Sequence, residues 1–126
     1  MERRFQSRLQ EVDAACLELR VFLQAQGLAA RLFPIELTVR ECLNNAVIHG
    51  NQHDPSRRVL FCVRVGPRWL RITVADEGPG FAWRRRACIP GSEASHGRGI
   101  SILALHTRKV SYNQRGNSVT LWFERG

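Results

Sequence analysis

The chain has 126 residues, of which 44% are hydrophobic and 24% charged; this is the size and balance of one folded domain and excludes wholesale disorder. No apolar run approaches the ~20 residues of a membrane span, and the polar N-terminus is unlike a secretory signal, so we expect a single cytoplasmic domain over residues 1–126 without membrane contact. The formal net charge of +8 comes from 19 basic and 11 acidic residues spread along the chain, and this diffuse pattern makes direct nucleic-acid binding a rival hypothesis, not the leading one.

The N-terminal half of the chain predicts a weak leading strand and two helices. Residues 4–9 can form the short strand. Over residues 11–26 the apolar side chains recur at helical spacing, and Gly27 stands where a left-handed helix cap is expected. A second helix is expected to begin near Pro34, which a first helical turn tolerates, and its apolar stripe continues to Val47.

The C-terminal half predicts two pairs of strands separated by a longer segment. Residues 51–58 contain Asp-Pro-Ser and are typical of a loop. Residues 81–96 have no clear period, and residues 97–106 predict a helix. Four segments have the alternating pattern of strands, over residues 59–65, 70–74, 109–114 and 118–124.

This order of elements determines the expected fold class. Helices do not alternate strictly with strands, so a doubly wound parallel sheet is excluded. Tight turns between consecutive strands predict a mostly antiparallel, mixed sheet with the helices packed on one face. We therefore expect an α/β (α+β) protein built as a two-layer sandwich.

The four cysteines are interpreted as structural thiols. They lack the close spacing of a zinc site, and two of them fall on the apolar faces of the expected helices. In a reducing cytosol such residues behave as small buried hydrophobes. The four are Cys16, Cys42, Cys62 and Cys88.

Three polar residues form a row on the second helix. Glu41, Asn45 and His49 are spaced by four, so they lie on a slanting line beside the apolar stripe, with Thr38 one turn earlier. The carboxylate could accept a proton from a hydroxyl or a water, and the amide oxygen is a hard ligand suited to Mg²⁺. A solvated helix edge explains the same row about equally well.

Two glycine-rich segments follow the helix. Asp76-x-Gly78-x-Gly80 ends a strand, where the glycines would let a flat ring approach the backbone and the carboxylate would accept from an exocyclic amine. The sequence Gly-Arg-Gly at 97–99 opens a helix, whose free N–H groups attract anions such as phosphate. Alone, each segment is explained at least as well by a glycine-rich turn.

Together the three segments resemble the N, G1 and G2 boxes of the GHKL ATPase superfamily, which includes gyrase, MutL and histidine kinases. The order of the boxes and the flanking elements agree with the Bergerat ATP-binding fold over residues 5–123, nearly the whole chain. Only about thirty residues precede the N-box helix, and no transducer domain follows. Within the superfamily, the chain is therefore most similar to the small anti-sigma-factor serine kinases of bacteria.

The resemblance implies a role for each matching residue. Glu41 would be the general base that activates a substrate serine, and Asn45 would coordinate Mg²⁺ at the phosphates. Asp76 would accept from the adenine amine, and residues 81–96 would form a lid over ATP. The remaining ATP-binding residues would be His49, Gly78, Gly80, Gly97, Arg98, Gly99 and Ile100.

The resemblance also implies a function and its partners. The expected activity is an ATP- and Mg²⁺-dependent protein serine kinase that phosphorylates a STAS-domain antagonist and regulates transcription, with a sigma factor as a second partner. A homodimer is expected on the same ground. The alternative is an ATP-sensing interaction module without efficient phosphotransfer. The presence of Glu41 favours the kinase, because nucleotide binding alone needs no base there.

Overall fold

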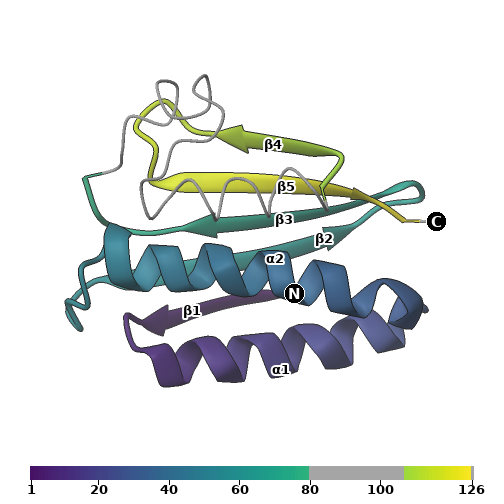
Figure 1. Cartoon of the computed structure of the whole chain (residues 1–126), viewed down its shortest axis with the longest axis horizontal. Coiled ribbons are helices and arrows are strands. Elements are labelled where there is room, and N and C mark those ends of the chain that lie inside the picture. Colours follow the sequence, from purple (N-terminus) through teal and green to yellow (C-terminus); the bar gives the residue numbers. More distant parts are fainter. Residues whose placement is uncertain (80–106, 126) are drawn as a thin grey trace.

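The computed structural model describes residues 1–79 and 107–125 (Figure 1). The segment expected to be a lid, the helix expected at 97–106 and Cys88 lie outside the described residues. No helix in the described part of the chain is long and apolar enough to cross a membrane. The elements in chain order are β1 (Glu2–Gln6), α1 (Leu9–Ala25), the 3₁₀ turn η1 (Ala29–Arg31), α2 (Leu32–Asn45), the π-helical turn η2 (Ala46–Gly50), β2 (Arg58–Val65), β3 (Trp69–Ala75), β4 (Lys109–Tyr112) and β5 (Ser118–Glu124).

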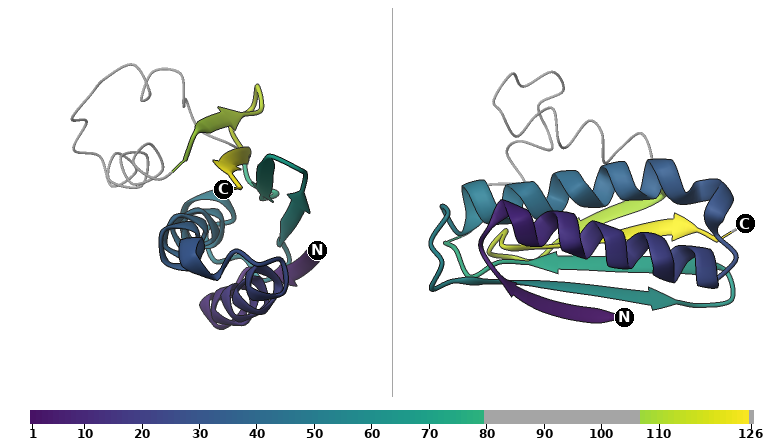
Figure 2. Two further views of the ribbon diagram at one scale, coloured as in Figure 1. Left: turned by 90° about the vertical axis from the view of Figure 1, so that its right-hand side faces the viewer. Right: turned by 90° about the horizontal axis from the view of Figure 1, so that it is seen from below.

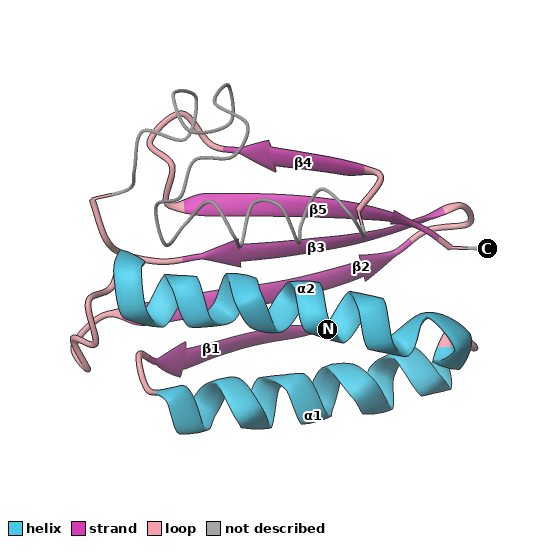
Figure 3. Ribbon diagram, viewed as in Figure 1, coloured by secondary structure: helices cyan, strands magenta, loops and turns pink. Residues whose placement is uncertain are grey.

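The five described strands form one sheet in the order β1-β2-β3-β5-β4, and every neighbouring pair is antiparallel. A tight turn joins β2 to β3, where the N–H of Gly66 donates to the carbonyl oxygen of Trp69 at 2.7 Å. Helices α1 and α2 lie side by side on one face of this sheet (Figures 2 and 3). The arrangement confirms the predicted two-layer sandwich of mostly antiparallel strands with helices on one face.

The core lies between the helices and the sheet. Alternate residues of β2, β3 and β5 face the helices, and the apolar stripes of α1 and α2 meet them. Each fully buried aliphatic or aromatic side chain contributes roughly 1.5–3 kcal/mol relative to an exposed one. The largest of these side chains are Phe61, Phe123, Leu19, Leu23, Ile35, Leu43, Leu70, Ile72 and Leu121.

Two cysteines lie within this core, as the sequence predicts. Cys16 on α1 and Cys42 on α2 are buried and have free thiols. Burial raises the pKa of the Cys16 thiol to about 11 and raises the pKa of Cys42 as well. Both therefore stay protonated at neutral pH and behave as small apolar residues.

Several element boundaries differ from the sequence prediction. Strand β1 occupies Glu2–Gln6 and not residues 4–9, because the hydroxyl of Ser7 donates to the carbonyl oxygen of Arg57 at 2.8 Å and the chain turns there. Helix α2 begins at Leu32, so Pro34 lies in its first turn. The N–H groups of a first turn have no acceptor within the helix, so proline, which lacks an N–H, costs no hydrogen bond there. The φ of +74° at Gly27 confirms the left-handed cap after α1.

Candidate functional site

The C-terminal end of α2 lies beside the end of β3 and the beginning of β5 (Figure 1). Here the helix widens into the π-helical turn η2, in which the N–H of Asn51 donates to the carbonyl oxygen of Ala46 at 2.8 Å. The next two residues, Gln52 and His53, have positive φ values of 53° and 57°, which are uncommon outside glycine. Rare turns and strained backbone concentrate at functional sites, so this helix end is the first candidate.

The widened turn changes the predicted polar row. Glu41 and Asn45 lie one α-helical turn apart, so their side chains share a face of α2, and both are half-buried. Within residues 1–79 and 107–125, neither side chain makes a hydrogen bond or ion pair. His49 lies inside the π turn and is exposed. The structure thus places the base and metal-ligand candidates together and gives His49 a different environment.

Thr38 does not belong to this polar face. Its side chain is fully buried, and its hydroxyl donates to the carbonyl oxygen of Pro34 at 2.8 Å. The hydroxyl is satisfied inside its own helix, which is a common arrangement for a buried threonine. Thr38 therefore belongs to the core and not to the candidate site.

Asp76 follows β3 and presents a partly desolvated carboxylate. Its Oδ1 accepts a hydrogen bond from the N–H of Gly78 at 2.8 Å, whereas Oδ2 makes none with the residues that the structure describes. Burial raises the pKa of the Asp76 carboxyl above its usual range, although the Gly78 N–H and the charge of Arg57 oppose the rise. A desolvated carboxylate with an open acceptor oxygen suits a ligand that brings its own N–H donor.

Two glycines bring the end of α2 against Asp76. A Cβ atom added to Gly50 would overlap the Asp76 carboxylate, and one added to Gly78 would overlap the carbonyl group of Gly50. At position 78 only glycine fits, because the added Cβ would meet backbone atoms of Gly50. At position 50 the added Cβ would meet the side chain of Asp76, so that carboxylate would have to move. The glycine at 78 therefore allows a close approach by Gly50, in addition to the ligand-shaping role expected from the sequence.

We expect Gly50→Ala to lower the free energy of unfolding by ~1–3 kcal/mol, because the added methyl group would displace the Asp76 carboxylate, which accepts a hydrogen bond from the N–H of Gly78. Urea denaturation measures this change. Gly66→Ala is the matched control, since its added Cβ would come no closer than 3.5 Å to the carbonyl oxygen of Trp69. Equal stabilities of the two variants would contradict the close Gly50–Asp76 contact.

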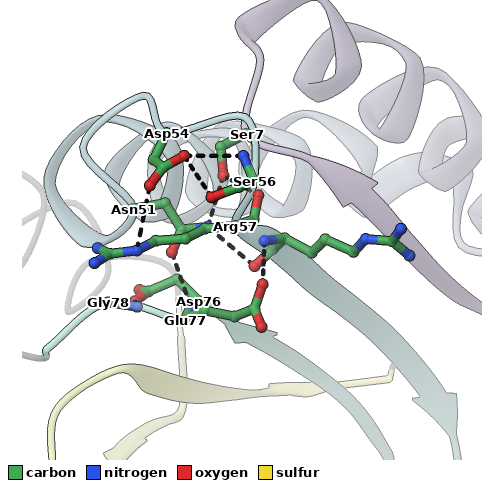
Figure 4. A network of polar contacts seen from close by, with 9 residues as sticks. Ser7, Asn51, Asp54, Ser56, Arg57, Asp76, Glu77 and Gly78 are labelled. Carbon is green, nitrogen blue, oxygen red and sulfur yellow. Dashed lines mark hydrogen bonds and ion pairs between the residues drawn. The ribbon is translucent and has the colours of Figure 1, made fainter.

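A buried asparagine joins several segments beside Asp76 (Figure 4). The side chain of Asn51 is 0% exposed, and its Nδ2 donates to Ser7 Oγ at 2.6 Å and to the carbonyl oxygen of Arg58 at 2.9 Å. Its Oδ1 accepts from the N–H of Glu77 at 2.8 Å. Asn51 therefore ties the helix end to Ser7 just after β1, to the first residue of β2 and to the turn that carries Asp76.

Asn51 is one of two residues beside Asp76 that the sequence does not single out. The sequence predicts a loop over residues 51–58, whereas Asn51 is buried and Arg58 already belongs to β2. Glu77 was also unassigned, and its carboxylate accepts from the N–H of Arg58. A polar residue next to a helix-ending glycine carries no periodic signal of burial, so no pattern in the sequence singled it out.

The turn between β4 and β5 closes the other side of Asp76. The backbone N–H of Asp76 donates to the carbonyl oxygen of Asn117 at 2.8 Å, and the Asn117 side chain donates to the carbonyl oxygen of Gly78 at 3.3 Å. The Asn113 side chain holds this turn by accepting from the N–H of Gly116 at 2.8 Å. Asp76 is thus positioned by three separate segments.

The other predicted site residues lie outside the described part of the chain, so the structure neither brings them together nor separates them. Their roles stay predictions from the sequence. They are Gly80, Gly97, Arg98, Gly99 and Ile100.

Comparisons with known proteins agree with this arrangement. The chain matches the family of histidine kinase-like ATPase domains over residues 5–123. It is 31% identical over 83 residues to an anti-sigma F factor from Geobacillus thermodenitrificans, covering 65% of this chain and 57% of that protein. An anti-sigma F factor from Shouchella clausii is 35% identical over 51 residues, which are 40% of this chain and 35% of the relative.

A solved structure shares the fold. It is a histidine kinase domain from a blue-light-activated histidine kinase of Erythrobacter litoralis, with a TM-score of 0.59 and 22% sequence identity. The match covers 77% of this chain and 46% of that one. The chain therefore spans little more than half the length of the first relative, and less of the other two.

Proposed function

The chain belongs to the family of histidine kinase-like ATPase domains, and we propose that it is a protein serine kinase of the anti-sigma-factor type. The family implies ATP binding, and the anti-sigma F factors among its relatives support an ATPase of the anti-sigma-factor kind. The observation that carries the proposal is the Gly50–Asp76 contact, which joins the helix bearing Glu41 and Asn45 to the Asp76 turn.

The residues around Asp76 fit an adenine ring. The adenine amine is a donor, and Asp76 offers it a partly desolvated carboxylate whose Oδ2 accepts no hydrogen bond from the described residues. The backbone at Gly50 and Gly78 carries no side chain that would cover this carboxylate. Gly80 is proposed to complete the same pocket.

The residues of α2 fit the chemistry of phosphate transfer. Asn45 offers an amide oxygen without a partner in the described part of the chain, and this is the kind of hard ligand that Mg²⁺ accepts. When bound, Mg²⁺ would offset negative charge on the phosphates. His49 and residues 97–100 are proposed to contact the phosphates.

Glu41 is proposed to act as the general base. A serine hydroxyl is a weak nucleophile at neutral pH, and a positioned carboxylate activates it by accepting its proton. The serine oxygen then bonds to the terminal phosphorus of ATP, the bond from that phosphorus to the bridging oxygen breaks, and ADP leaves. Glu41 is half-buried and has no ion pair within residues 1–79 and 107–125, so its carboxylate is available for that proton. Its position one turn before Asn45 directs both side chains toward the same region.

The proposed phosphoacceptor is a serine of a STAS-domain antagonist, and a sigma factor is the second proposed partner. The names of the similar proteins support the sigma-factor connection. A homodimer in the cytoplasm remains part of the proposal. The direct test is incubation of the protein with Mg-ATP and a STAS-domain protein, followed by mass spectrometry of the partner. Absence of a phosphoserine despite ATP binding would favour the ATP-sensing module.

Replacing Asp76 by asparagine is expected to weaken ATP binding by ~10–100-fold, because it exchanges a charged acceptor for an amide and costs ~1.5–3 kcal/mol. Isothermal titration calorimetry measures the affinity. Asp54 gives the matched control, since Asp54→Asn removes the same charge from the loop before β2, where the side chain is 43% exposed. Unchanged affinity in Asp76→Asn would contradict the adenine assignment.

The same variant should be more stable than the wild type without nucleotide. A carboxyl whose pKa is raised in the folded state binds more protons folded than unfolded, so the protein loses stability as the pH rises through that pKa. At neutral pH the buried, ionised Asp76 carboxylate destabilises the folded wild type, and the neutral amide of Asp76→Asn does not. Thermal melts should therefore show a higher melting temperature for the variant at pH 7, with a difference that shrinks as the pH falls.

A further inference from the structure

The sheet face opposite to α1 and α2 carries three cations and one tryptophan in register, one on each of four strands. The two helices cover the other face (Figure 2). Arg64 on β2 is in register with Arg71 on β3, Arg71 with Trp122 on β5, and Trp122 with Lys109 on β4. Residues in register point to the same face, and here it is the face away from the buried residues of each strand. We call these four residues the cation row; at ~4.8 Å per strand it spans ~14 Å.

The cation row is unfavourable for the isolated protein. Arg64 and Arg71 stand directly opposite each other, and like charges at such positions destabilise a sheet. Both are exposed, and neither forms an ion pair with the described residues. Lys109 is also exposed, and its ammonium lies 4.8 Å from the centre of the Trp122 ring. An anionic group placed between the two guanidinium groups would relieve this repulsion.

The surroundings of the row add an apolar contact. A groove of about 470 Å³ is lined by the four residues of the row together with Val65, Gly66 and Trp69. The side chain of Trp69 is 42% exposed at the end of this groove. Arginine and tryptophan are the residues most enriched at the energetic centres of protein–protein interfaces. The groove thus combines positive charge with one aromatic surface.

We propose that the cation row is the docking surface for an acidic segment of a partner protein. Carboxylates of that segment would pair with Arg64 and Arg71, which bind carboxylates through two parallel hydrogen bonds, and an apolar side chain would rest on Trp69. The row lies on the sheet face opposite to α2, the helix that carries Glu41 and Asn45. A partner held there leaves that helical face uncovered, so the proposal goes beyond phosphotransfer and does not depend on it.

Two other occupants fit the surface less well. Single-stranded nucleic acid binds through successive bases stacked on open aromatic faces. Here Lys109 lies over the Trp122 ring, which leaves Trp69 as the open one of the two tryptophans in the groove. A second copy of this chain in a two-fold dimer would set one cation row against another. Both therefore serve as alternative outcomes of the test.

The test uses a fluorescein-labelled peptide of glutamate with leucine at every third position, titrated with the full chain in the absence of nucleotide. We expect the double variant Arg64→Gln/Arg71→Gln to bind the peptide at least ~10-fold more weakly than the wild type, since it loses two charge-assisted contacts. The control Arg4→Gln/Arg8→Gln removes the same charge from two exposed positions near the other edge of the sheet. It should bind within ~3-fold of the wild type, since screened charges at a distance contribute little.

A second readout separates docking from general charge effects. The Arg64→Gln/Arg71→Gln variant should melt at a higher temperature than the wild type, because the opposed like charges are gone. Peptide affinity that falls equally in both double variants, or no peptide binding by the wild type, would overturn the proposal. Tighter binding of an oligothymidine of equal charge through the same two arginines would also overturn it. The same holds for a dimer, seen in sedimentation, that dissociates in Arg64→Gln/Arg71→Gln and not in the control. Both double variants should bind ATP with the wild-type affinity, which would show that the change in peptide binding does not arise at the nucleotide site.

Discussion

Replacing Glu41 by glutamine should slow phosphotransfer to the partner serine by ~10²–10⁴-fold, while Mg-ATP still binds within a few-fold of the wild-type affinity. Glutamine keeps the volume of the side chain but cannot accept the hydroxyl proton. Glu41 is half-buried with no partner among residues 1–79 and 107–125, so its loss should disturb the fold little. Single-turnover transfer with saturating Mg-ATP measures the rate of the chemical step.

Asn45→Ala is the companion variant for this experiment. It removes the proposed metal ligand one helical turn away, so it should weaken Mg-ATP binding and transfer together. The pair of variants separates proton acceptance from metal binding. Transfer by Glu41→Gln at the wild-type rate would show that Glu41 is not the base.

Asn51→Ala is expected to have the largest effect on stability, lowering the free energy of unfolding by ~3 kcal/mol or more. The substitution leaves a hydroxyl, a carbonyl and an N–H without the hydrogen bonds that Asn51 supplies, and each such group costs ~1–3 kcal/mol when it stays buried. Because Asn51 also holds the backbone of Glu77, the Asp76 turn should lose its position and ATP affinity should fall. Urea denaturation and calorimetry measure the two effects.

The matched control for this variant is Asn44→Ala. Asn44 is a half-buried asparagine on α2 with no side-chain hydrogen bond in the described part of the chain. Its replacement should change the free energy of unfolding by less than ~0.5 kcal/mol, as at most sites without a special contact. A similar small change in Asn51→Ala would mean that the buried network does not hold the helix end.

The sequence predicted most of the fold because the main signals are local. The apolar stripe of α2 and the alternation in β2, β3 and β5 report which face is buried, and they need no knowledge of the partner element. Strand β1 was misplaced because one of its inward positions is Arg3, which pairs with Glu11 and Glu18 on α1 at 3.0 Å each. An ion pair on the buried side removes the alternation by which a strand is recognised.

In the candidate site, too, the sequence predicted the local features and not the contacts between distant residues. Glu41 and Asn45 were predicted as a pair because positions four apart share a face of any α-helix. The contact of Gly50 with Asp76 and the bonds of Asn51 to Glu77 and Ser7 join residues 26 or more positions apart, and no local pattern encodes such contacts. The π turn was equally hidden, and it moves His49 away from the line that regular helical spacing predicts.

The two buried cysteines can report when the layer formed by α1 and α2 separates from the sheet. Cys16 lies on α1 and Cys42 on α2, and their raised pKa values keep both thiols unreactive while the layer is closed. A thiol reagent can modify them only when the layer opens, so the labelling rate reports the free energy of that opening. Measured with serine at positions 62 and 88, the two rates would tell whether α1 and α2 leave the sheet as one cooperative unit or separately.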